Sequence, residues 1–299
     1  MPDRERASIL SNFNPPFRVF GPEQQSAPFV LCSPHSGRVY PEYFLSQSRL
    51  DPLTLRKSED SYVDALFQHV SRIGAPLIAA EFPRAYLDLN REAYELDPEL
   101  FAEPLPDYAN TQSVRVVGGL GTIARIVADG EEIYLEPLSL AVAIERIERL
   151  YKPFHTALGG LVAATRDQFG YAILIDCHSM PSASLVSGGA PRPDFVLGDR
   201  FGASCDSRLT RFMRDVLTGL GYDVQLNRPY AGGFITEHYG RPSQQVHALQ
   251  IEINRGLYLD EATMLPTAGF IELERHLTIL TTRLFKSFPA LFERRLAAE

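Results

Sequence analysis

Short apolar runs alternate along the chain with longer segments of helical periodicity. Five runs are strand candidates, and most of them are apolar throughout instead of alternating, as in strands that are covered on both faces. These runs are residues 29–32, 76–80, 171–175, 195–197 and 248–251, and residues 224–226 form a shorter sixth candidate. An alternation of such strands with helices predicts an α/β fold.

Apolar residues that recur every three or four positions predict the helices. One such stripe runs from residue 138 to 161, and Pro153 should kink or split it, because proline lacks a backbone donor. A second helix is expected over 209–217, where Gly219 and Gly221 follow. A last, long helix starts near Ile271, and we expect it to break close to Pro289.

The length and composition are those of an ordinary globular protein. The chain has 299 residues, of which 45% are hydrophobic and 22% charged, and it contains no internal repeat. We therefore expect a single catalytic domain over 1–299, with irregular loop insertions near 94–121 and 181–193, which are rich in turn-forming residues.

The charge excludes some partners. Lysine and arginine number 29 against 37 acidic residues, a net charge of −8, which argues against a nucleic-acid partner. An anionic small-molecule substrate would need a local group of arginines. We find no signal-peptide pattern and no apolar run of the roughly 20 residues that span a bilayer. With three scattered cysteines, the expected location is cytoplasmic.

Reactive side chains follow several of the apolar runs. Ligands bind beyond the carboxyl ends of the strands in an open α/β sheet, so residues at these positions are candidates for a site. The four segments are Ser33-Pro34-His35-Ser36-Gly37, Glu81-Phe82-Pro83-Arg84, Asp176-Cys177-His178-Ser179 and Glu252-Ile253-Asn254-Arg255.

Imidazoles and a carboxylate that converge from separate strands are typical of a catalytic zinc site, in which a fourth position stays open for water. His35 and His178 are the imidazole candidates, and Glu252 is the candidate general base. The third ligand should be Asp60, with Glu59 as the alternative, at the start of a helix expected over 61–70. A strand-end histidine is often only a hydrogen-bonded core residue, so a structural role stays open.

Asp176 lies two residues before His178, where it could orient that ring as an acceptor, or cap or pair within the fold. A serine nucleophile, Ser36 or Ser179, is disfavoured because the chain lacks a G-x-S-x-G elbow. Cys177 should point away from Asp176 into the packed interior, because strand residues alternate. The loop over 228–234 is either a mobile cover or a plain turn.

Together these segments resemble the N-formylglutamate amidohydrolase family over residues 28 to 285. The motifs are Pro34-His35-Ser36-Gly37, Glu59-Asp60, Arg84-Ala85-Tyr86-Leu87-Asp88-Leu89-Asn90-Arg91, Asp176-Cys177-His178-Ser179-Met180 and Glu252-Ile253-Asn254-Arg255. The resemblance implies a three-layer α/β fold, like that of zinc carboxypeptidases, with a mixed, mostly parallel sheet flanked by helices. It also implies hydrolysis of N-formyl-L-glutamate to glutamate and formate, the last step of one histidine-degradation route.

By the same resemblance, His35, His178 and Asp60 would bind Zn²⁺ or another divalent metal, and Glu252 would be the base and proton shuttle. Because glutamate carries two carboxylates, guanidinium groups should recognise it. The substrate-binding candidates are Arg84, Asn90, Arg91 and Arg255. The alternatives are a related metallo-amidohydrolase or carboxypeptidase for another N-acyl amino acid or peptide, and an inactive homologue that binds a small molecule. The sequence predicts no oligomeric state.

Overall fold

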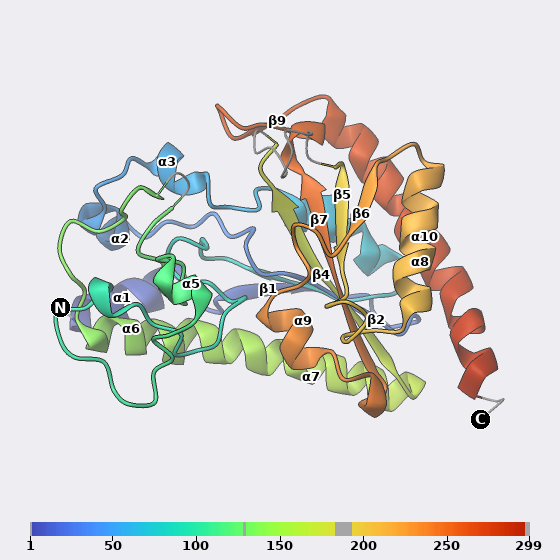
Figure 1. The fold of residues 1–299 in the computed structure, drawn as a ribbon, viewed down its shortest axis with the longest axis horizontal. Helices are drawn as coiled ribbons and strands as arrows, with labels where there is room; N and C mark the ends of the chain where they lie inside the picture. Colours follow the sequence, from blue (N-terminus) through green and yellow to red (C-terminus); the bar gives the residue numbers. More distant parts are fainter. Residues whose placement is uncertain (1, 128–129, 183–192, 297–299) are drawn as a thin grey trace. The chain divides into compact units, whose positions relative to one another are not determined.

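The computed structural model describes residues 2–127, 130–182 and 193–296, which include a seven-stranded sheet (Figure 1). The order of its strands is β1-β3-β2-β4-β7-β5-β6. Their bounds are β1 Phe17–Phe20, β2 Phe29–Ser33, β3 Leu77–Ala80, β4 Ala172–Met180, β5 Phe195–Gly198, β6 Val224–Leu226 and β7 Val246–Asn254. A separate pair is formed by β8 (Leu259–Asp260) and β9 (Leu265–Pro266).

The chain divides into two compact units. Unit 1 comprises Met1–Arg18, Pro34–Ser61 and Ala79–Leu158, and unit 2 comprises Val19–Ser33, Tyr62–Ile78 and Gly159–Glu299. Strands β2, β4, β5, β6 and β7 lie wholly in unit 2, whereas β1 and β3 have residues in both. The single catalytic domain expected over 1–299 stays a prediction.

Most of the strand pairs in unit 2 are parallel. β4 pairs in parallel with both β2 and β7, and β5 pairs in parallel with β6, whereas β5 runs antiparallel to β7. The sheet is therefore mixed and mostly parallel, as expected. The register sets His178 opposite Glu252 on neighbouring strands, so their side chains project from the same face.

Alternate residues of the strands in unit 2 build its core. Ile173, Ile175 and Cys177 of β4, and Leu249 and Ile251 of β7, belong to one buried apolar cluster. Residues of β2, β3 and β5 also belong to it, and three helices add further members: α4 (Val63–Phe67), and α8 (Ser207–Gly219) and α10 (Gly269–Leu296), which Figure 1 labels. Helix α9 (Phe234–Tyr239) lies against β4 and β7. The intervening residues of β4 and β7 face away from the apolar cluster, and among them are the polar candidates.

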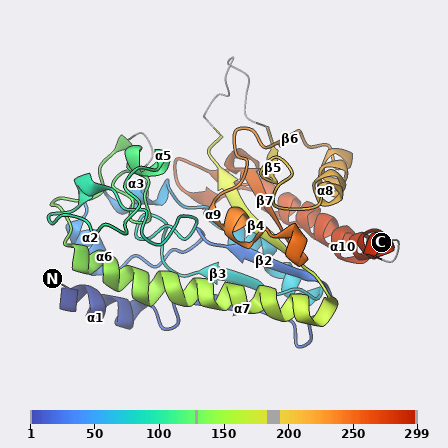
Figure 2. The ribbon, with the colours of Figure 1, turned by 60° about the horizontal axis from the view of Figure 1, so that its bottom comes forward.

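Apart from its residues of β1 and β3, unit 1 is made of helices and irregular segments. Figure 2 shows α1 (Pro2–Asn12) running beside α6 (Leu140–Arg146), and a buried ion pair joins them, with Arg146 Nε 2.6 Å from Glu5 Oε1. The guanidinium of Arg146 also lies 3.9 Å from the ring centroid of Tyr86. Further helices of this unit include α2 (Glu42–Gln47), α3 (Pro52–Arg56), η2 (Pro98–Leu100) and α5 (Val114–Val117).

All six expected strands are present, but β4 and β7 are longer than the apolar runs that predict them. Asp176, His178 and Glu252 lie inside these strands and not beyond their ends, which corrects the expected position. The strands continue because polar residues occupy only alternate positions, while Cys177 and Ile253 keep the other face apolar.

The helix predictions hold with two corrections. The stripe near Pro153 is split, because a π-helical turn, η4 (Ile147–Tyr151), separates α6 from α7 (Lys152–Phe169). The break expected near Pro289 is wrong: α10 continues to Leu296, since one missing donor does not end a long helix. The helix expected over 61–70 is divided into α4 and η1 (Gln68–Arg72). Two further short helices are η5 (Pro242–Gln244) and η6 (Arg255–Leu257).

Of the two expected loop insertions, residues 94–121 are largely irregular and contain η2 and α5. Most of the second, residues 183–192, lies outside the described residues. Among the helices of the described residues, none combines the length and the apolar character needed to cross a membrane.

Candidate metal centre and active site

In unit 1, the segment after β2 is held against the segment before α4. The amide of Asp60 donates to the carbonyl of His35 at 3.0 Å, and the hydroxyl of Ser36 donates to the carbonyl of Asp60 at 3.1 Å. These bonds bring the side chains together, with His35 Nδ1 3.3 Å from Asp60 Oδ2. Both side chains are buried, each 1% exposed. The imidazole and carboxylate that the sequence singles out are therefore neighbours.

The other ring nitrogen of His35 faces a second carboxylate. His35 Nε2 lies 2.7 Å from Asp88 Oδ1, which also accepts from the amide of Asn90 at 2.8 Å. The second oxygen of Asp88 accepts from Arg84 Nε at 3.0 Å and lies 3.4 Å from a terminal nitrogen of Arg91. A buried carboxylate beside Nε2 favours the tautomer that carries its proton there, which leaves Nδ1 as the electron-pair donor.

The charges around Asp88 keep it ionised. Burial opposes ionisation, but Arg84, Arg91 and His35 outweigh it and hold the pKa of this carboxyl well below its usual range. The same environment lowers the pKa of the Arg91 guanidinium, chiefly by burial, to about 10. Asp88 is thus a permanent acceptor for His35 at neutral pH.

Glu59, the alternative carboxylate ligand, is committed to other partners. Its side chain is fully buried and accepts from Tyr40 Oη at 2.7 Å and from Arg56 Nε at 3.2 Å, and Ser61 also donates to it. Burial and the neighbouring Glu59 raise the pKa of Tyr40 well above its usual value, so Tyr40 remains a donor. Of the adjacent carboxylates, Asp60 is the one that lies next to His35.

In unit 2, the polar face of β4 and β7 carries four buried side chains in a regular arrangement. Asp176 is opposite Gln250, and His178 is opposite Glu252. Along β4, His178 Nε2 lies 2.9 Å from Asp176 Oδ1. Along β7, Gln250 Nε2 donates to Glu252 Oε1 at 2.8 Å. Each upstream residue therefore meets the side chain two positions further along its own strand.

The candidate substrate-binding residues differ in exposure. Arg84 keeps 29% of its side chain exposed, whereas Arg91 keeps 4% and donates to the backbone carbonyls of Leu120 and Asn90. In unit 2, Arg255 is 4% exposed, and its Nε donates to Ser179 Oγ at 3.1 Å. Asn90 is buried, and its backbone amide bonds to Asp88.

The structure also bears on two lesser candidates. Cys177 belongs to the buried apolar cluster, where burial and then Asp176 raise the pKa of its thiol well above the usual value. A thiolate nucleophile is therefore disfavoured at this position, as its place in the strand predicts. The loop over 228–234 is closely packed, because a side-chain Cβ at Gly198 would lie 2.7 Å from the carbonyl carbon of Ala231.

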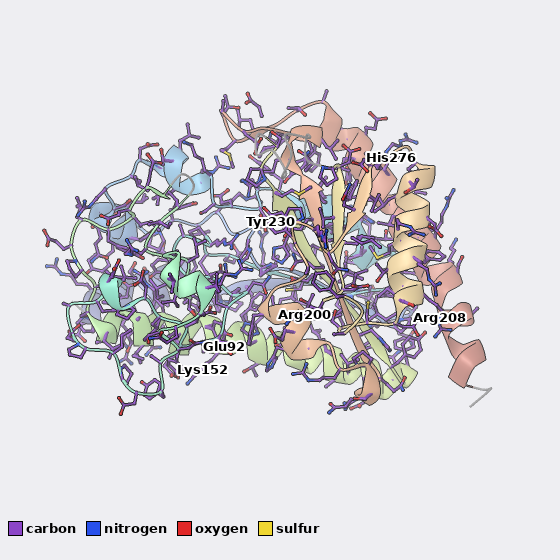
Figure 3. The ribbon with its side chains drawn as sticks, viewed as in Figure 1. Glu92, Lys152, Arg200, Arg208, Tyr230 and His276 are labelled. Carbon is purple, nitrogen blue, oxygen red and sulfur yellow. The ribbon has the colours of Figure 1, made fainter. Side chains whose placement is uncertain are left out.

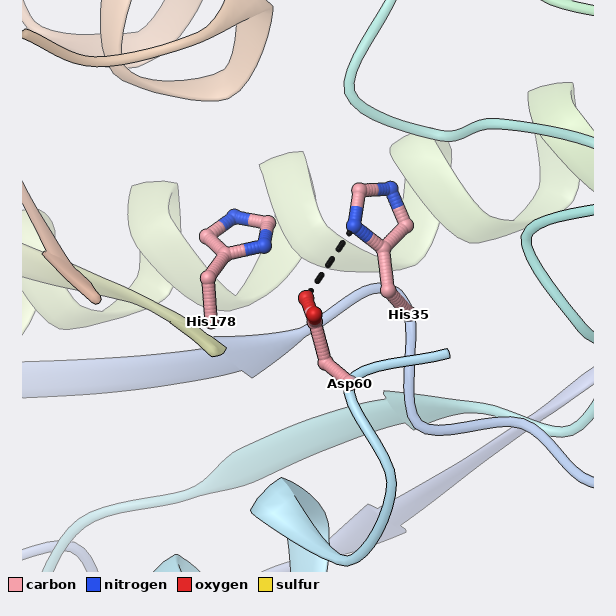
Figure 4. A group of neighbouring side chains, drawn as sticks. All are labelled: His35, Asp60 and His178. Carbon is pink, nitrogen blue, oxygen red and sulfur yellow. Dashed lines mark hydrogen bonds and ion pairs between the residues drawn. The ribbon is translucent and has the colours of Figure 1, made fainter. Parts of the chain in front are cut away.

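Figure 4 shows the group formed by His35, Asp60 and His178. Each of these buried residues offers one ligand atom, and the three atoms lie within 4.8 Å of one another. Two ligands of a tetrahedral ion with bonds of about 2.0–2.1 Å lie about 3.3–3.4 Å apart. The 3.3 Å between His35 Nδ1 and Asp60 Oδ2 matches this spacing. A donor set of two imidazoles and a carboxylate fits a divalent metal ion.

Two residues were not assigned roles from the sequence. Asp88 is part of the motif over 84–91, but its partner His35 lies 53 positions away. Gln250 precedes Glu252 by two positions, a spacing that sets both on the same face of β7. The alternation along β7 could have indicated Gln250, whereas no local pattern indicates Asp88.

Comparisons with known proteins by family model and by sequence point to the same family. The model of the N-formylglutamate amidohydrolase family matches residues 27–259. An N-formylglutamate deformylase of Pseudomonas putida is 30% identical over 251 residues, which cover 82% of this chain and 86% of the relative. The N-formylglutamate deformylase of Pseudomonas aeruginosa is 31% identical over 239 residues, covering 78% of this chain and 83% of the relative.

Solved structures agree with the sequence comparisons. The crystal structure of N-formylglutamate amidohydrolase from Ralstonia eutropha JMP134 has a TM-score of 0.86 and 38% identity, and covers 91% of this chain and 97% of that one. A gene product of Agrobacterium tumefaciens, with a TM-score of 0.62, 19% identity and coverage of 91% and 99%, shares the fold. The resemblance noted in the sequence is confirmed, and the chain belongs to the N-formylglutamate amidohydrolase family.

Proposed function

We propose that this protein is a zinc-dependent amidohydrolase that cleaves N-formyl-L-glutamate to L-glutamate and formate. The observation that carries the proposal is the buried His35–Asp60–His178 group, together with the register that sets Glu252 opposite His178. The names of the relatives support the substrate, and this reaction would complete a route of histidine degradation.

The metal ligands in this proposal are His35, His178 and Asp60. Asp88 and Asp176 each lie beside the Nε2 atom of one imidazole and so support its Nδ1 as donor. Glu59 is not needed as a ligand, since Tyr40 and Arg56 already occupy its carboxylate. A bound zinc ion would supply Lewis acidity, which polarises the scissile carbonyl and makes water more acidic.

Glu252 is the general base. It would take a proton from the attacking water and transfer it to the leaving nitrogen as the amide bond breaks. Its side chain is 7% exposed, so bulk water competes little for the proton that it carries. Its place opposite His178 supports this role, because general base and metal ligands must meet at the same carbonyl.

Substrate carboxylates would be bound by guanidinium groups, for which Arg84, Arg91 and Arg255 are the candidates, with Asn90 assisting. Arg84 is the best supported, because it combines an exposed portion with a fixed contact to Asp88. Such a contact limits the conformational freedom that the side chain loses on binding, and a planar guanidinium recognises a carboxylate with two hydrogen bonds.

Release of formate from N-formyl-L-glutamate is the test, with N-acetyl-L-glutamate and a glutamyl peptide measured beside it. We expect formate release that is lost on chelation and restored by zinc. Full activity in a metal-free preparation would contradict the metal proposal. Cleavage of the acetyl or peptidyl compound alone would indicate a related amidohydrolase or carboxypeptidase, and binding without turnover would indicate an inactive homologue.

The base is tested by Glu252→Gln. We expect this variant to keep its metal and to lose about 10²–10⁴-fold in kcat, the usual contribution of a positioned base. Glu272→Gln, at an exposed position on α10, is the matched control and should leave kcat unchanged. Retention of full turnover by Glu252→Gln would exclude this residue as the base.

A further inference from the structure

The amide of Gln250 connects Glu252 to the backbone of the loop before α9. Gln250 Nε2 donates to Glu252 Oε1 at 2.8 Å, and Gln250 Oε1 accepts from the amide of Gly233 at 2.9 Å. Gln250 is 4% exposed, so water competes little for either bond. Both ends of this side-chain amide are therefore bound inside the protein.

The backbone bond fixes which way the amide points. A backbone N–H can only donate, so the oxygen of Gln250 must face Gly233 and its NH₂ must face Glu252. Glu252 Oε1 is then obliged to accept, which is the role of an ionised carboxylate oxygen. A hydrogen bond of this kind holds the carboxylate in one orientation.

The loop that supplies the Gly233 amide is itself held in place. Arg200 N donates to the carbonyl of Ala231 at 2.7 Å, and the backbone of Ala231 and Gly232 fits against Gly198, where even a Cβ would be too close. Arg200 and Tyr230, labelled in Figure 3, belong to the two segments, after β5 and after β6, that make this contact. The Gly233 amide thus has a fixed position relative to β7.

We infer that Gln250 is a positioning residue for the general base: anchored by Gly233, it aims the Glu252 carboxylate and keeps that oxygen an acceptor during turnover. This inference rests on the proposed function, which assigns Glu252 as the base. Asp176 and His178 repeat the arrangement on β4, since an upstream residue there also meets the side chain two positions on. On each of the two neighbouring strands, a candidate reactive group thus lies beside the side chain two positions before it.

Two variants distinguish the hydrogen bond of Gln250 to Glu252 from its hydrogen bond to the Gly233 amide. Gln250→Glu keeps an oxygen for the Gly233 amide but removes the donor to Glu252, whereas Gln250→Met removes both. We expect both variants to lose about 10- to 100-fold in kcat, the usual effect of removing an orienting partner, with KM changed less than about twofold. Gln225→Met, on the exposed face of β6, is the matched control and should leave kcat unchanged.

Combination with Glu252→Gln tests whether Gln250 acts through the base. In that background we expect Gln250→Met to reduce the residual kcat no further, while metal content and melting temperature match those of the single variants. Multiplying losses would overturn the inference, and so would full activity of Gln250→Glu. If Glu252→Gln itself keeps full turnover, the proposed base fails. If Glu252→Gln loses turnover but both Gln250 variants keep it, only the role of Gln250 fails.

Discussion

The imidazole of His35 is held between two carboxylates, with Nε2 2.7 Å from Asp88 Oδ1 and Nδ1 3.3 Å from Asp60 Oδ2. The two contacts indicate different roles for the two ring nitrogens. The shorter one fixes the proton on Nε2, and the longer one has the spacing of two ligands around a common ion. Asp88 is therefore part of the proposed metal centre, although it is not one of the expected ligands.

Replacement of Asp88 by asparagine should weaken metal binding. The neutral amide cannot stabilise the Nε2–H tautomer as a carboxylate does, and loss of such a partner costs about 10- to 100-fold in metal affinity. Competition with a chelator of known affinity measures this change. Asp107→Asn, at an exposed position of the same unit, is the control. Equal zinc affinity in Asp88→Asn and the wild type would show that Asp88 does not support His35.

Gly37 is a position at which a single methyl group should disturb the centre. A Cβ there would lie 2.0 Å from the backbone oxygen of Phe82, so the chain after His35 would have to move. We expect Gly37→Ala to lower both the unfolding midpoint and the zinc affinity. Gly21→Ala is the matched control, because no atom lies within 4 Å of its added Cβ. A zinc affinity unchanged in Gly37→Ala would mean that the segment adjusts without moving His35.

The sequence predicts the fold well because its signals are local. The apolar runs that became β2, β3 and β5 are each a few residues long, and the stripes that became α7 and α8 repeat every turn. The errors also have local causes. β4 and β7 extend beyond their apolar runs because polar residues occupy one face only, a pattern of period two that a search for continuous apolar residues misses.

The sequence predicts which residues form the candidate site better than it predicts the contacts between them. His35, Asp60 and His178 could be named as a group because each has a side chain suited to a metal and a place near a strand end or helix start. Contacts that depend on distant pairing could not be read from the sequence. The bond from Gly233 to Gln250 and the contact of Asp88 with His35 arise only when segments far apart in the chain meet.

Stability should fall in mild acid because of His247. Burial lowers its pKa to about 4, with Asp206 opposing and Arg208 adding to the shift. Its pKa in the unfolded chain is about 6.5, so the unfolded state binds more protons between these values. The contribution of His247 is therefore complete above pH 6.5 and is lost as the pH falls towards 4, by about 3 kcal/mol.

Urea unfolding across this pH range measures the effect. Asn has an oxygen where His247 Nδ1 accepts from the amide of Asp206 at 3.1 Å, so His247→Asn should keep that bond and lose the pH dependence. His276→Asn, which removes an imidazole bonded to Tyr222 on another element, should leave the dependence in place. An acid slope that is the same in His247→Asn as in the wild type would assign the slope to other groups.

The ion pair of Arg146 and Glu5 should be essential for holding α1 against α6. Both side chains are fully buried, and Arg146 also donates to the carbonyl of Tyr86 at 3.0 Å and to Tyr134 Oη at 2.7 Å. Arg146→Met would leave Glu5 charged and buried without its partner, a change that costs about 3–5 kcal/mol. We expect this loss in the free energy of unfolding measured with urea.

A double variant distinguishes the cost of the unpaired Glu5 charge from the cost of lost packing. The cost comes from the Glu5 carboxylate, which is left buried without Arg146. Glu5→Leu combined with Arg146→Met should therefore restore part of the lost free energy of unfolding, as apolar replacements of buried pairs often do. Arg214→Met is the control: it breaks an exposed pair with Asp215 and should cost no more than about 1 kcal/mol. If the double variant were less stable than Arg146→Met alone, the packing of Glu5 and not its charge would account for the loss.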